Sequence, residues 1–515
     1  MADSRDLLGA IRKVGESGSL DHDAIAGISM QLKVPVSKVK SVSSFYDFDA
    51  GEDKMCNGLP CGLNQDQAFL NSNRGRFKEE PCLGYCGHSP VFRINGKYFS
   101  RTRSVLTEIR ESTAEYMNER REGTAEYLVH GGYSAMEQVL GMSDHSGVIE
   151  KVEKSGLRGM GGAGFPVARK WKSISRDRGT ESYLLVNGHE GEPGTFKDRV
   201  IMELTPHGVV EGSYIVAIVN RLSTIVIALR ADYRNAIASM ERAMNSFRRR
   251  YEDLSRRIPA ILTPVGGGYV TGEETALMES IEGRRGEPRL RPPFPTEKGL
   301  NGKPTLVHNP ETLSIIPKII ASPGYRVTKS FCLTGDVKKP GIYHETLGIS
   351  AEELLHDRGG TSASDLKAFF PGGLSGSVFP ASSLSMKLNF DSVGDAGGGF
   401  GTGAFIGIAR NRCMVDITKR VAKFFETESC GKCAPCRLGT KEISVVMQKL
   451  SSGKGTKEDL EFGKKVATGM IEGSICALGQ VAGKTFIDAV TRFSEEFASH
   501  VKSACPEGVC RTEKP

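Results

Sequence analysis

Twelve cysteines, most of them in closely spaced groups, constrain this 515-residue chain more than any other feature. Two groups lie at positions 56, 61, 82 and 86 and at positions 430, 433, 436 and 476, and the others lie at 332, 413, 505 and 510. A secreted disulfide scaffold is small and follows a signal peptide, whereas residues 1–15 mix charges among leucines and lack an apolar signal core. The pattern favours metal or iron–sulfur ligation in a reducing compartment, and we expect a cytoplasmic protein.

The strongest local pattern is three cysteines spaced by two residues and completed by a distant fourth. Its members are Cys430, Cys433, Cys436 and Cys476. Three such thiolates can cover one face of a cubane, and the fourth completes the set that a [4Fe–4S] cluster needs. The alternative is structural zinc, which usually pairs two Cys-x2-Cys knuckles. The three-plus-one spacing favours the [4Fe–4S] cluster.

Composition excludes several classes of protein. Hydrophobic residues make up 39% and charged residues 25% of the chain, which is typical of globular proteins. No apolar run approaches the roughly 18 residues of a membrane span, so we expect no transmembrane segment. The net charge of +7 comes with no polybasic tail, and the run of Arg248, Arg249 and Arg250 fits a solvated surface. We therefore expect no nucleic-acid partner.

The pattern along the chain predicts a multidomain α/β protein. Residues 151–325 alternate strand-like runs with helical ones, which indicates an α/β layer fold. A strand over residues 90–94 ends in an Asn95-Gly96 turn, and a polar helix is expected over residues 104–121. The expected units are a small helical bundle (1–50), a cysteine-rich unit (51–103), a linker helix region (104–150), the α/β domain (151–325), a small β-rich domain (326–412), a helical cysteine domain (413–500) and a tail (501–515).

Three polar segments of the α/β domain predict a cofactor pocket. Residues 156–166 (GLRGMGGAGFP) are rich in glycine, which lets a backbone approach a phosphate. Residues 187–199 (NGHEGEPGTFKDR) follow a buried-strand run, and residues 272–275 (GEET) open a helix. The glycine spacing is not that of a Rossmann fingerprint. Loops of this kind at the carboxyl ends of parallel strands suit a flavin and a nucleotide.

These segments resemble the NADH- and FMN-binding subunit of respiratory complex I and its relatives in NAD-linked hydrogenases and formate dehydrogenases. The resemblance continues through RPPFP at residues 291–295, GKPT at 302–305 and NPET at 309–312, and covers roughly residues 130–500. It implies bound FMN, an NAD(P)H site beside it and a [4Fe–4S] cluster as electron acceptor. It also implies an α/β flavin-binding domain, a β-grasp (ubiquitin-like) domain over 326–412 and a helical iron–sulfur domain.

The resemblance implies roles for individual residues. The positions that match the FMN phosphate loop are Gly159, Gly161, Gly162 and Lys170. The flavin-side positions are Asn187, Glu190, Glu273 and Asn309, and the nucleotide positions are Phe165, Glu192, Glu274 and Phe294. His189 and His308 lie close to the expected flavin but replace the Asp and Asn of the family. Further departures are Met160 for Arg, Thr271 for Cys, Ser173 for an aromatic residue and Arg291 for Lys.

The N-terminal cysteines resemble the thioredoxin-like [2Fe–2S] domain of the complex I partner subunit. The four positions are Cys56, Cys61, Cys82 and Cys86. Only 20 residues separate the two pairs, compared with roughly 35 in that family. A shortened connection can still bring both pairs to one rim, and the alternative is a domain that has kept its thiols without iron. All four thiols are present, which favours a [2Fe–2S] cluster.

The remaining cysteines suggest a second metal. Cys413, His500, Cys505 and Cys510 supply the three thiolates and one imidazole of a structural zinc site. The tail resembles the segment that precedes an added ferredoxin domain in the β subunit of electron-bifurcating hydrogenases, where this pattern binds zinc. The alternative is a frayed tail with idle cysteines. Cys332 is then left as a buried core thiol in a strand.

The combined interpretation is an electron-transfer (diaphorase) subunit, an NAD(P)H:acceptor oxidoreductase. A flavin converts the hydride of a nicotinamide into the single electrons that clusters accept, and this needs no general base. We therefore expect no catalytic side chain, and a site-shaping role for His189. Expected partners are the other subunits of a soluble hydrogenase or formate dehydrogenase, and ferredoxin where the flavin bifurcates electrons. The alternative function is a non-catalytic relay or scaffold whose altered pocket no longer binds nicotinamide.

Overall fold

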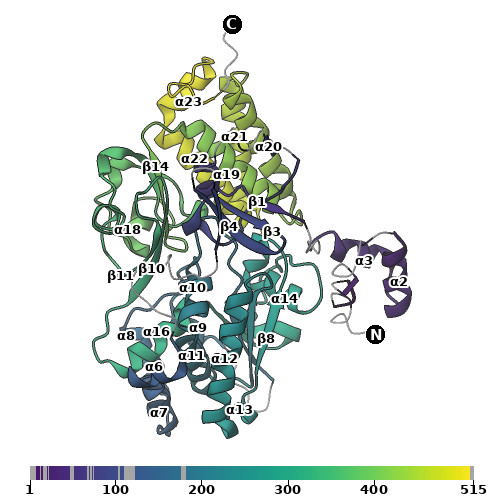
Figure 1. Ribbon diagram of the computed structural model, residues 1–515, viewed down its shortest axis with the longest axis vertical. Coiled ribbons are helices and arrows are strands. Elements are labelled where there is room, and N and C mark those ends of the chain that lie inside the picture. The colour runs from purple at the N-terminus through teal and green to yellow at the C-terminus, as the bar shows by residue number, and fades with distance from the viewer. Residues whose placement is uncertain are drawn as a thin grey trace.

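The computed structural model describes residues 22–46, 52–65, 75–102, 105–109, 122–174 and 181–510, with isolated positions at 7, 9–11, 13–14, 20, 69 and 72–73. The chain forms a body built on a parallel sheet, a β-rich unit beside it and a helical unit at the opposite end (Figure 1). The N-terminal sheet lies between these parts, and helices α2 and α3 project to one side. Within the described residues, no helix is both long and apolar enough to cross a membrane.

The N-terminal helices form the expected small bundle. Helix α2 (His22–Leu32) and helix α3 (Val36–Ser43) are separated by Pro35, which precedes the first turn of α3. Their apolar faces meet in a core that contains Leu7, Ile11, Ile25, Ile28, Val39 and Val42. The bundle is attached to the rest of the chain through Tyr46, whose hydroxyl donates to the carbonyl of Arg284 at 2.6 Å.

The cysteine-rich unit is a five-stranded mixed sheet with the order β2-β1-β3-β4-β5. Its elements are β1 (Lys54–Cys56), α4 (Leu59–Leu63), β2 (Lys78–Glu80), β3 (Val91–Ile94), β4 (Lys97–Thr102) and β5 (Val105–Glu108). The expected Asn95-Gly96 turn joins β3 to β4, with positive φ at both residues. The expected helix over residues 104–121 is wrong at its start, because Val105, Leu106 and Thr107 pair with β4. Residues 110–121 lie outside the described part.

The α/β domain has four parallel strands in the order β8-β7-β6-β9, as the alternating pattern predicts. Its elements are α6 (Thr124–Val129), α7 (Ser134–Leu140), α8 (Ser146–Lys154), α9 (Val167–Lys172), β6 (Tyr183–Gly188), α10 (Lys197–Leu204), α11 (Pro206–Val219), β7 (Thr224–Arg230), α12 (Arg234–Arg250), α13 (Glu252–Arg257), β8 (Ala260–Val265), α14 (Glu274–Ile281), α15 (Pro295–Lys298), β9 (Thr305–His308) and α16 (Pro310–Ala321). Helices α11 and α16 cross closely, since a Cβ on Gly212 would lie 2.0 Å from the carbonyl oxygen of Leu313.

The β-rich unit is a second mixed sheet, with the order β11-β10-β14-β12-β13. Its elements are β10 (Thr328–Gly335), β11 (Gly341–Thr346), α17 (Ala351–Glu353), β12 (Leu366–Phe370), β13 (Phe379–Pro380), α18 (Phe390–Asp395) and β14 (Ala404–Ala409). Strands β10 and β14 run parallel at the centre. Cys332 is fully buried in β10, which confirms its expected place in the core.

The C-terminal unit is helical, as expected. Its helices are α19 (Met414–Glu428), α20 (Ala434–Ser451), α21 (Lys457–Gly473), α22 (Ala477–Arg492) and α23 (Ser494–Val501). Glycines allow close packing here, because a Cβ on Gly439 would lie 2.4 Å from Met470 and a Cβ on Gly463 would lie 2.9 Å from Phe486. Cys430, Cys433 and Cys476 lie in loops between these helices, and Cys436 lies in the first turn of α20.

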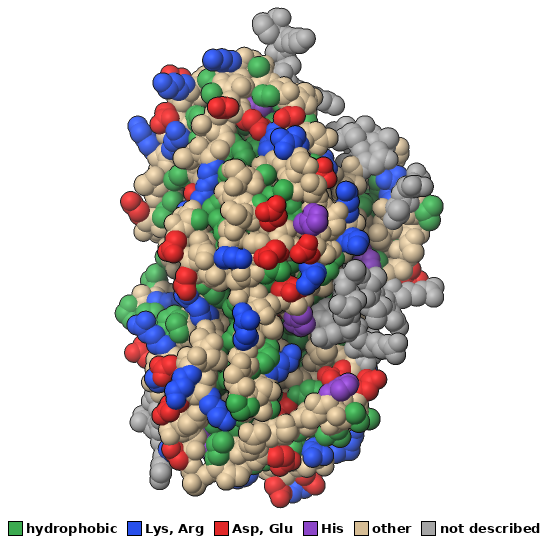
Figure 2. Space-filling view, turned by 90° about the vertical axis from the view of Figure 1, so that its left-hand side faces the viewer, with side chains coloured by type: hydrophobic (Ala, Val, Ile, Leu, Met, Phe, Trp, Pro, Cys, Tyr) green, Lys and Arg blue, Asp and Glu red, His purple; other side chains and the backbone are tan. Residues whose placement is uncertain are grey.

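Surface charge agrees with the composition. On the face shown in Figure 2, Lys and Arg side chains are interspersed with Asp and Glu side chains. Arg248, Arg249 and Arg250 at the end of α12 are exposed, as expected of a solvated run.

Candidate functional site

The glycine-rich loop lies between α8 and α9 and is folded against the end of strand β9. The backbone N–H of Gly159 donates to the carbonyl of Phe165 at 2.9 Å, and that of Met160 donates to Thr312 Oγ1 at 2.9 Å. Gly161 faces Asn309, because a Cβ on this glycine would lie 3.3 Å from the Asn309 Cβ. Gly162 has φ +126°, which an L side chain rarely adopts. The loop therefore keeps an open backbone surface beside Asn309.

The carboxyl ends of β6 and β9 bring the expected flavin-side residues together. The two strands pair in parallel, with Val186 opposite His308. Asn187 Nδ2 donates to the carbonyl of Gly272 at 2.8 Å, which links β6 to the segment that opens α14. Asn309 caps α16 by accepting from the N–H of Glu311 at 3.0 Å. The three polar segments of the sequence thus meet at one edge of the sheet, as expected for a ligand site in an α/β fold.

Two buried histidines lie at this edge. His308 Nε2 accepts a hydrogen bond from Trp171 Nε1 at 2.8 Å. Burial and then the Lys170 charge lower the pKa of His308 to about 3. Burial and then the Arg230 charge lower the pKa of His189 to about 4. Both imidazoles are therefore neutral at pH 7.

A buried network of charged side chains lies beneath this edge of the parallel sheet. Of its members, the sequence predicted a site role only for Glu190. The Glu190 carboxylate accepts from the N–H groups of Asp198 at 3.1 Å and Arg199 at 3.2 Å, at the start of α10. Lys197 Nζ lies 2.6 Å from Asp198 and 3.2 Å from Glu311. Burial, and then the Asp198 charge, raise the pKa of Glu190 to about 7.

The remaining lysine of the network comes from the β-rich unit. Lys329 Nζ lies 2.5 Å from Glu311 and 3.5 Å from the carbonyl of Met160. Burial on its own raises the pKa of Glu311, but the Lys329 and Lys197 charges outweigh it and lower that pKa to about 2. Lys329 is the second residue of β10, between Thr328 and Ser330, so periodicity assigns it no role.

One expected nucleotide-side residue, Glu274, opens α14 next to the flavin-side Glu273. Glu273 caps this helix by accepting from the N–H groups of Thr275 and Ala276, both at 2.9 Å. Glu274 pairs with Lys170 at 3.1 Å and Arg291 at 3.0 Å. Burial raises the pKa of Glu274, but these two charges outweigh it and hold that pKa below its usual value.

Two aromatic rings are exposed near this acidic pair. Phe165 in the glycine loop and Phe294 at the start of α15 are 44% and 51% exposed. The guanidinium of Arg169 lies 5.7 Å from the centre of the Phe165 ring. Rings with an exposed face can stack on a planar ligand.

Glu192 links the α/β domain to the β-rich unit. Its carboxylate accepts from the N–H of Ser375 at 2.8 Å, and a Cβ on Gly373 would lie 2.7 Å from its carboxyl carbon. Burial raises the pKa of Glu192 to about 7. The glycine clusters of the β-rich unit were a usable signal, since Gly401 also lies against Gly162.

The C-terminal cysteine group lies at two helix starts. Cys433 is the cap residue of α20 and Cys476 is the cap residue of α22. Burial raises the pKa of Cys436 to about 11 and that of Cys476 to about 12, and the Glu273 charge contributes to the latter. Arg285 Nη2 donates to the carbonyl of Cys430 at 3.2 Å, and Lys432 Nζ donates to the carbonyl of Pro288 at 2.7 Å. The segment that follows α14 therefore adjoins the cysteine loop. Thiols of this kind ionise at neutral pH when a metal replaces the proton.

The N-terminal cysteines form a second buried group. The Sγ atoms of Cys82 and Cys86 lie 3.7 Å apart, and Leu83, next to Cys82, lies in one buried cluster with Cys56 and Cys61. All four side chains are at most 4% exposed. The shortened connection between the two pairs therefore still brings them together.

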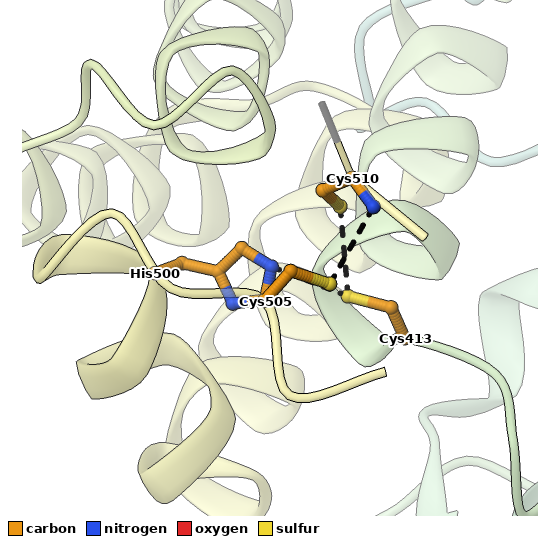
Figure 3. A group of neighbouring side chains, drawn as sticks. All are labelled: Cys413, His500, Cys505 and Cys510. Carbon is orange, nitrogen blue, oxygen red and sulfur yellow. Dashed lines mark hydrogen bonds between the residues drawn. The ribbon is translucent and has the colours of Figure 1, made fainter. Parts of the chain in front are cut away.

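The four expected zinc ligands converge at the end of the helical unit (Figure 3). Their ligand atoms all lie within 4.8 Å of one another. Cys413 Sγ lies 3.4 Å from His500 Nε2 and 3.7 Å from Cys510 Sγ. The other ring nitrogen of His500 lies 2.7 Å from the carbonyl of Glu496, which orients the imidazole. The arrangement has the donor set and size of a tetrahedral metal site.

Comparison with known proteins matches the two central parts of the chain. Residues 152–318 match the Nuo51 FMN-binding domain, and residues 416–500 match the NADH-ubiquinone oxidoreductase-F iron–sulfur binding region. An F-type NADH-quinone oxidoreductase subunit of Rhizobium meliloti (strain 1021), the one numbered 2, is 38% identical over 398 residues, which cover 73% of this chain and 94% of the relative. The F-type NADH-quinone oxidoreductase subunit of Mycobacterium tuberculosis (strain ATCC 25618 / H37Rv) is 37% identical over 403 residues, which cover 73% and 89%.

A solved structure matches more of the chain. It is the crystal structure of an NAD+-reducing [NiFe]-hydrogenase in the H2-reduced state, with a TM-score of 0.82 and 26% identity over 97% of this chain and 94% of that chain. The similarity therefore extends beyond the part shared with the two bacterial relatives. The resemblance found in the sequence is confirmed: the chain belongs to the family of F-type NADH-quinone oxidoreductase subunits, the flavin- and iron–sulfur-containing electron-transfer subunits of NADH dehydrogenases and NAD-reducing hydrogenases.

Proposed function

We propose that this chain is the diaphorase subunit of a multi-subunit oxidoreductase, and that it passes electrons between NAD(P)H and iron–sulfur clusters through FMN. The observation that carries the proposal is the convergence of the glycine loop, the ends of β6 and β9 and the start of α14 at one sheet edge. The segment that follows α14 adjoins the cysteine loop, where Arg285 donates to the carbonyl of Cys430 at 3.2 Å. A nucleotide site and a cluster site side by side suit electron transfer between them.

The pocket residues fit FMN. Gly161 is exposed and Gly162 is half-buried, so their backbone can approach a phosphate. Gly159 holds the loop through its bond to Phe165, and Lys170, which pairs with Glu274 at 3.1 Å, is the cation that the resemblance assigns to the phosphate. Both ring nitrogens of His189 are buried without a hydrogen-bond partner among the described residues, a state that buried polar atoms rarely keep. A polar edge of the flavin would give these two nitrogens hydrogen-bond partners. The other residues assigned to the flavin side are Asn187, Glu190, Glu273 and Asn309. When bound, FMN converts the two-electron hydride of a nicotinamide into single electrons.

The nicotinamide nucleotide is assigned to Phe165, Glu192, Glu274 and Phe294. The two exposed rings would stack on the nucleotide and shield it from water. Glu274 is ionised between Lys170 and Arg291, and a carboxylate at such a position accepts from ribose hydroxyls and disfavours a 2′-phosphate. This favours NADH over NADPH.

Two clusters and one zinc ion complete the proposed cofactor set. The [4Fe–4S] cluster is assigned to Cys430, Cys433, Cys436 and Cys476. The [2Fe–2S] cluster is assigned to Cys56, Cys61, Cys82 and Cys86. The burial of all four thiols supports this assignment over a metal-free domain. Zinc is assigned to Cys413, His500, Cys505 and Cys510.

The proposed partners are the iron–sulfur and catalytic subunits of a hydrogenase or formate dehydrogenase, with ferredoxin as a further partner if the flavin bifurcates electrons. Similarity to an NAD+-reducing hydrogenase over 97% of the chain supports the first of these. All twelve cysteines are described, and all carry free thiols, in keeping with a reducing cytoplasm.

Anaerobic purification of the whole chain tests the proposal. We expect noncovalent FMN, reduction of a dye by NADH, and about six iron atoms from one [4Fe–4S] and one [2Fe–2S] cluster. Four iron atoms and a single EPR signal would mean an empty N-terminal site. Absence of flavin would favour the alternative, a relay or scaffold subunit that binds no nicotinamide.

A further inference from the structure

The loop that carries Cys82 and Cys86 is held by the flavin-binding domain. The backbone N–H of Gly194 donates to Cys86 Sγ at 3.3 Å. Gly84, with φ +77°, lies so close to Tyr233 that a Cβ would be 2.6 Å from its hydroxyl oxygen. The cysteine loop therefore packs directly against the flavin-binding domain.

Arg230 at the end of β7 connects this loop to the flavin side. Its Nη2 donates to the carbonyl of Cys82 at 3.3 Å, and its Nη1 donates to the carbonyl of Glu190 at 3.0 Å. Asp232 holds the guanidinium in place, with contacts of 3.0 Å to Nε and 2.7 Å to Nη2. The Arg230 residue is 8% exposed, so its charge is poorly screened by water.

A second buried arginine contacts the same loop. Arg199 Nε donates to the carbonyl of Gly84 at 2.9 Å, and its guanidinium lies 3.9 Å from the ring centre of Tyr85. Its residue is fully buried. The flavin-binding domain thus places two guanidinium groups against three residues of the cysteine loop, Cys82, Gly84 and Tyr85.

We propose that Arg230 and Arg199 are positioning residues that raise the midpoint potential of the N-terminal [2Fe–2S] cluster. This inference rests on the proposed [2Fe–2S] site. Reduction adds one electron, supplied by the reduced flavin, and makes the cluster and its four thiolates more negative by one charge. Nearby positive charge in a buried site stabilises the reduced form more than the oxidised form. Two carboxylates oppose this effect. Asp232 offsets the Arg230 charge, and Glu203, 3.2 Å from Arg199 Nη1, offsets the Arg199 charge.

An EPR-monitored redox titration of the whole chain tests the inference. We expect Arg230→Met to shift the midpoint of the [2Fe–2S] signal to more negative potential, and Arg230→Lys to shift it less. Asp232→Asn is nearly isosteric and should shift it to more positive potential. Arg492→Gln is the matched control, because Arg492 also donates to carbonyls, of Val378 at 2.6 Å and Ala396 at 3.0 Å, but outside the cysteine loop.

Shifts of opposite sign at Arg230 and Asp232 separate a charge effect from loosened packing, which would move both variants the same way. Equal midpoints in all variants, or shifts of one sign, would overturn the inference while leaving the cluster assignment intact. A wild-type chain without a [2Fe–2S] signal would instead overturn the proposed cluster. If Arg230→Met fails to retain the cluster, Asp232→Asn tests the inference alone. A shift to more positive potential supports it, and a negative shift or no shift overturns it.

Discussion

Lys329 Nζ lies 2.5 Å from Glu311 Oε2, and neither side chain is more than 1% exposed. The pair joins strand β10 of the β-rich unit to helix α16 of the flavin-binding domain. Ser330 supplies a further hydrogen bond to Glu311 at 2.6 Å. Because Lys329 also lies 3.5 Å from the carbonyl of Met160, this buried pair fixes both domains around the glycine loop.

Replacing Lys329 should therefore weaken the fold and the pocket together. Lys329→Met leaves the Glu311 carboxylate buried with Lys197 as its remaining cation, and removing one partner of a buried pair costs about 3–5 kcal/mol. We expect a lower thermal unfolding temperature and faster loss of flavin, measured by fluorescence of the released FMN.

The matched control is Lys338→Met. Lys338 is 66% exposed and lies 3.8 Å from Asp365, so its loss should change stability by about 1 kcal/mol or less. Similar destabilisation by both variants would contradict a special role for the buried pair.

The buried His308 should make stability depend on pH. The pKa of His308 is lowered to about 3 in the folded chain, by burial and the Lys170 charge, from an ordinary 6.5. Above pH 6.5 the ring is neutral in both states, and below it the unfolded chain alone takes up the proton. Stability is thus lost as pH falls from about 6.5 toward 3, by about 1.4 kcal/mol per pH unit for this group.

A comparison of wild type with His308→Gln isolates the contribution of His308 to the pH dependence of stability, because the two proteins share every other titrating group. The wild type should lose stability relative to the variant between pH 6.5 and pH 4.5, measured by denaturant titration. Trp171 is the single tryptophan and donates to His308, so its fluorescence reports the site directly. His356→Gln makes the same substitution at a histidine that is 69% exposed, and serves as the control for His308→Gln. A pH-independent difference between wild type and His308→Gln would show that the ring is protonated in the folded chain.

Glu274 should affect nucleotide binding more than flavin binding. Its carboxylate lies between Lys170 and Arg291 at the rim of the pocket. We expect Glu274→Ala to raise KM for NADH by about tenfold, the equivalent of roughly one charge-assisted hydrogen bond, while the FMN content stays near that of wild type. Glu252→Ala, at an exposed position on α13, is the control. Equal loss of nucleotide and flavin would mean that Glu274 belongs to the flavin site.

Much of this arrangement was predictable from the sequence, because period and spacing report local structure. Alternating apolar runs predicted the parallel sheet, and the Asn95-Gly96 pair predicted the β3–β4 turn. Cysteine spacing predicted the group at 413, 500, 505 and 510, whose ligand atoms converge. The helix expected from residue 104 was wrong at its start, because strand β4 offered a pairing edge to β5 that overrode the polar composition.

Contacts between domains were not predictable in this way. Lys329, Arg199 and Arg230 are buried because of partners that lie far away in sequence, and a single sequence contains no period or spacing that links them. Arg199, for example, reaches Gly84 across 115 positions. Such pairings appear only when the domains are placed against one another.

The zinc assignment yields the last prediction. Three thiolates and one imidazole form a closed tetrahedral site with no position for substrate, so its role is mechanical. The site would tie the segment after α23 to Cys413, the cap residue at the start of α19. We expect about one zinc per chain, with Zn–S distances near ~2.3 Å. Cys505→Ser should release zinc and make the tail after residue 501 more sensitive to protease, with FMN content and NADH–dye activity largely unchanged.

The rest of the helical unit should survive this loss. Lys367 of β12 holds Glu496 at 2.7 Å and Glu507 at 2.6 Å, independently of any metal. Cys332→Ser is the matched control, since Cys332 is the one cysteine assigned to no metal site, and it should retain zinc and iron. Iron in place of zinc, or full zinc retention in Cys505→Ser, would show that these four residues do not form one zinc site. Loss of flavin in Cys505→Ser would show instead that the metal supports the pocket as well as the tail.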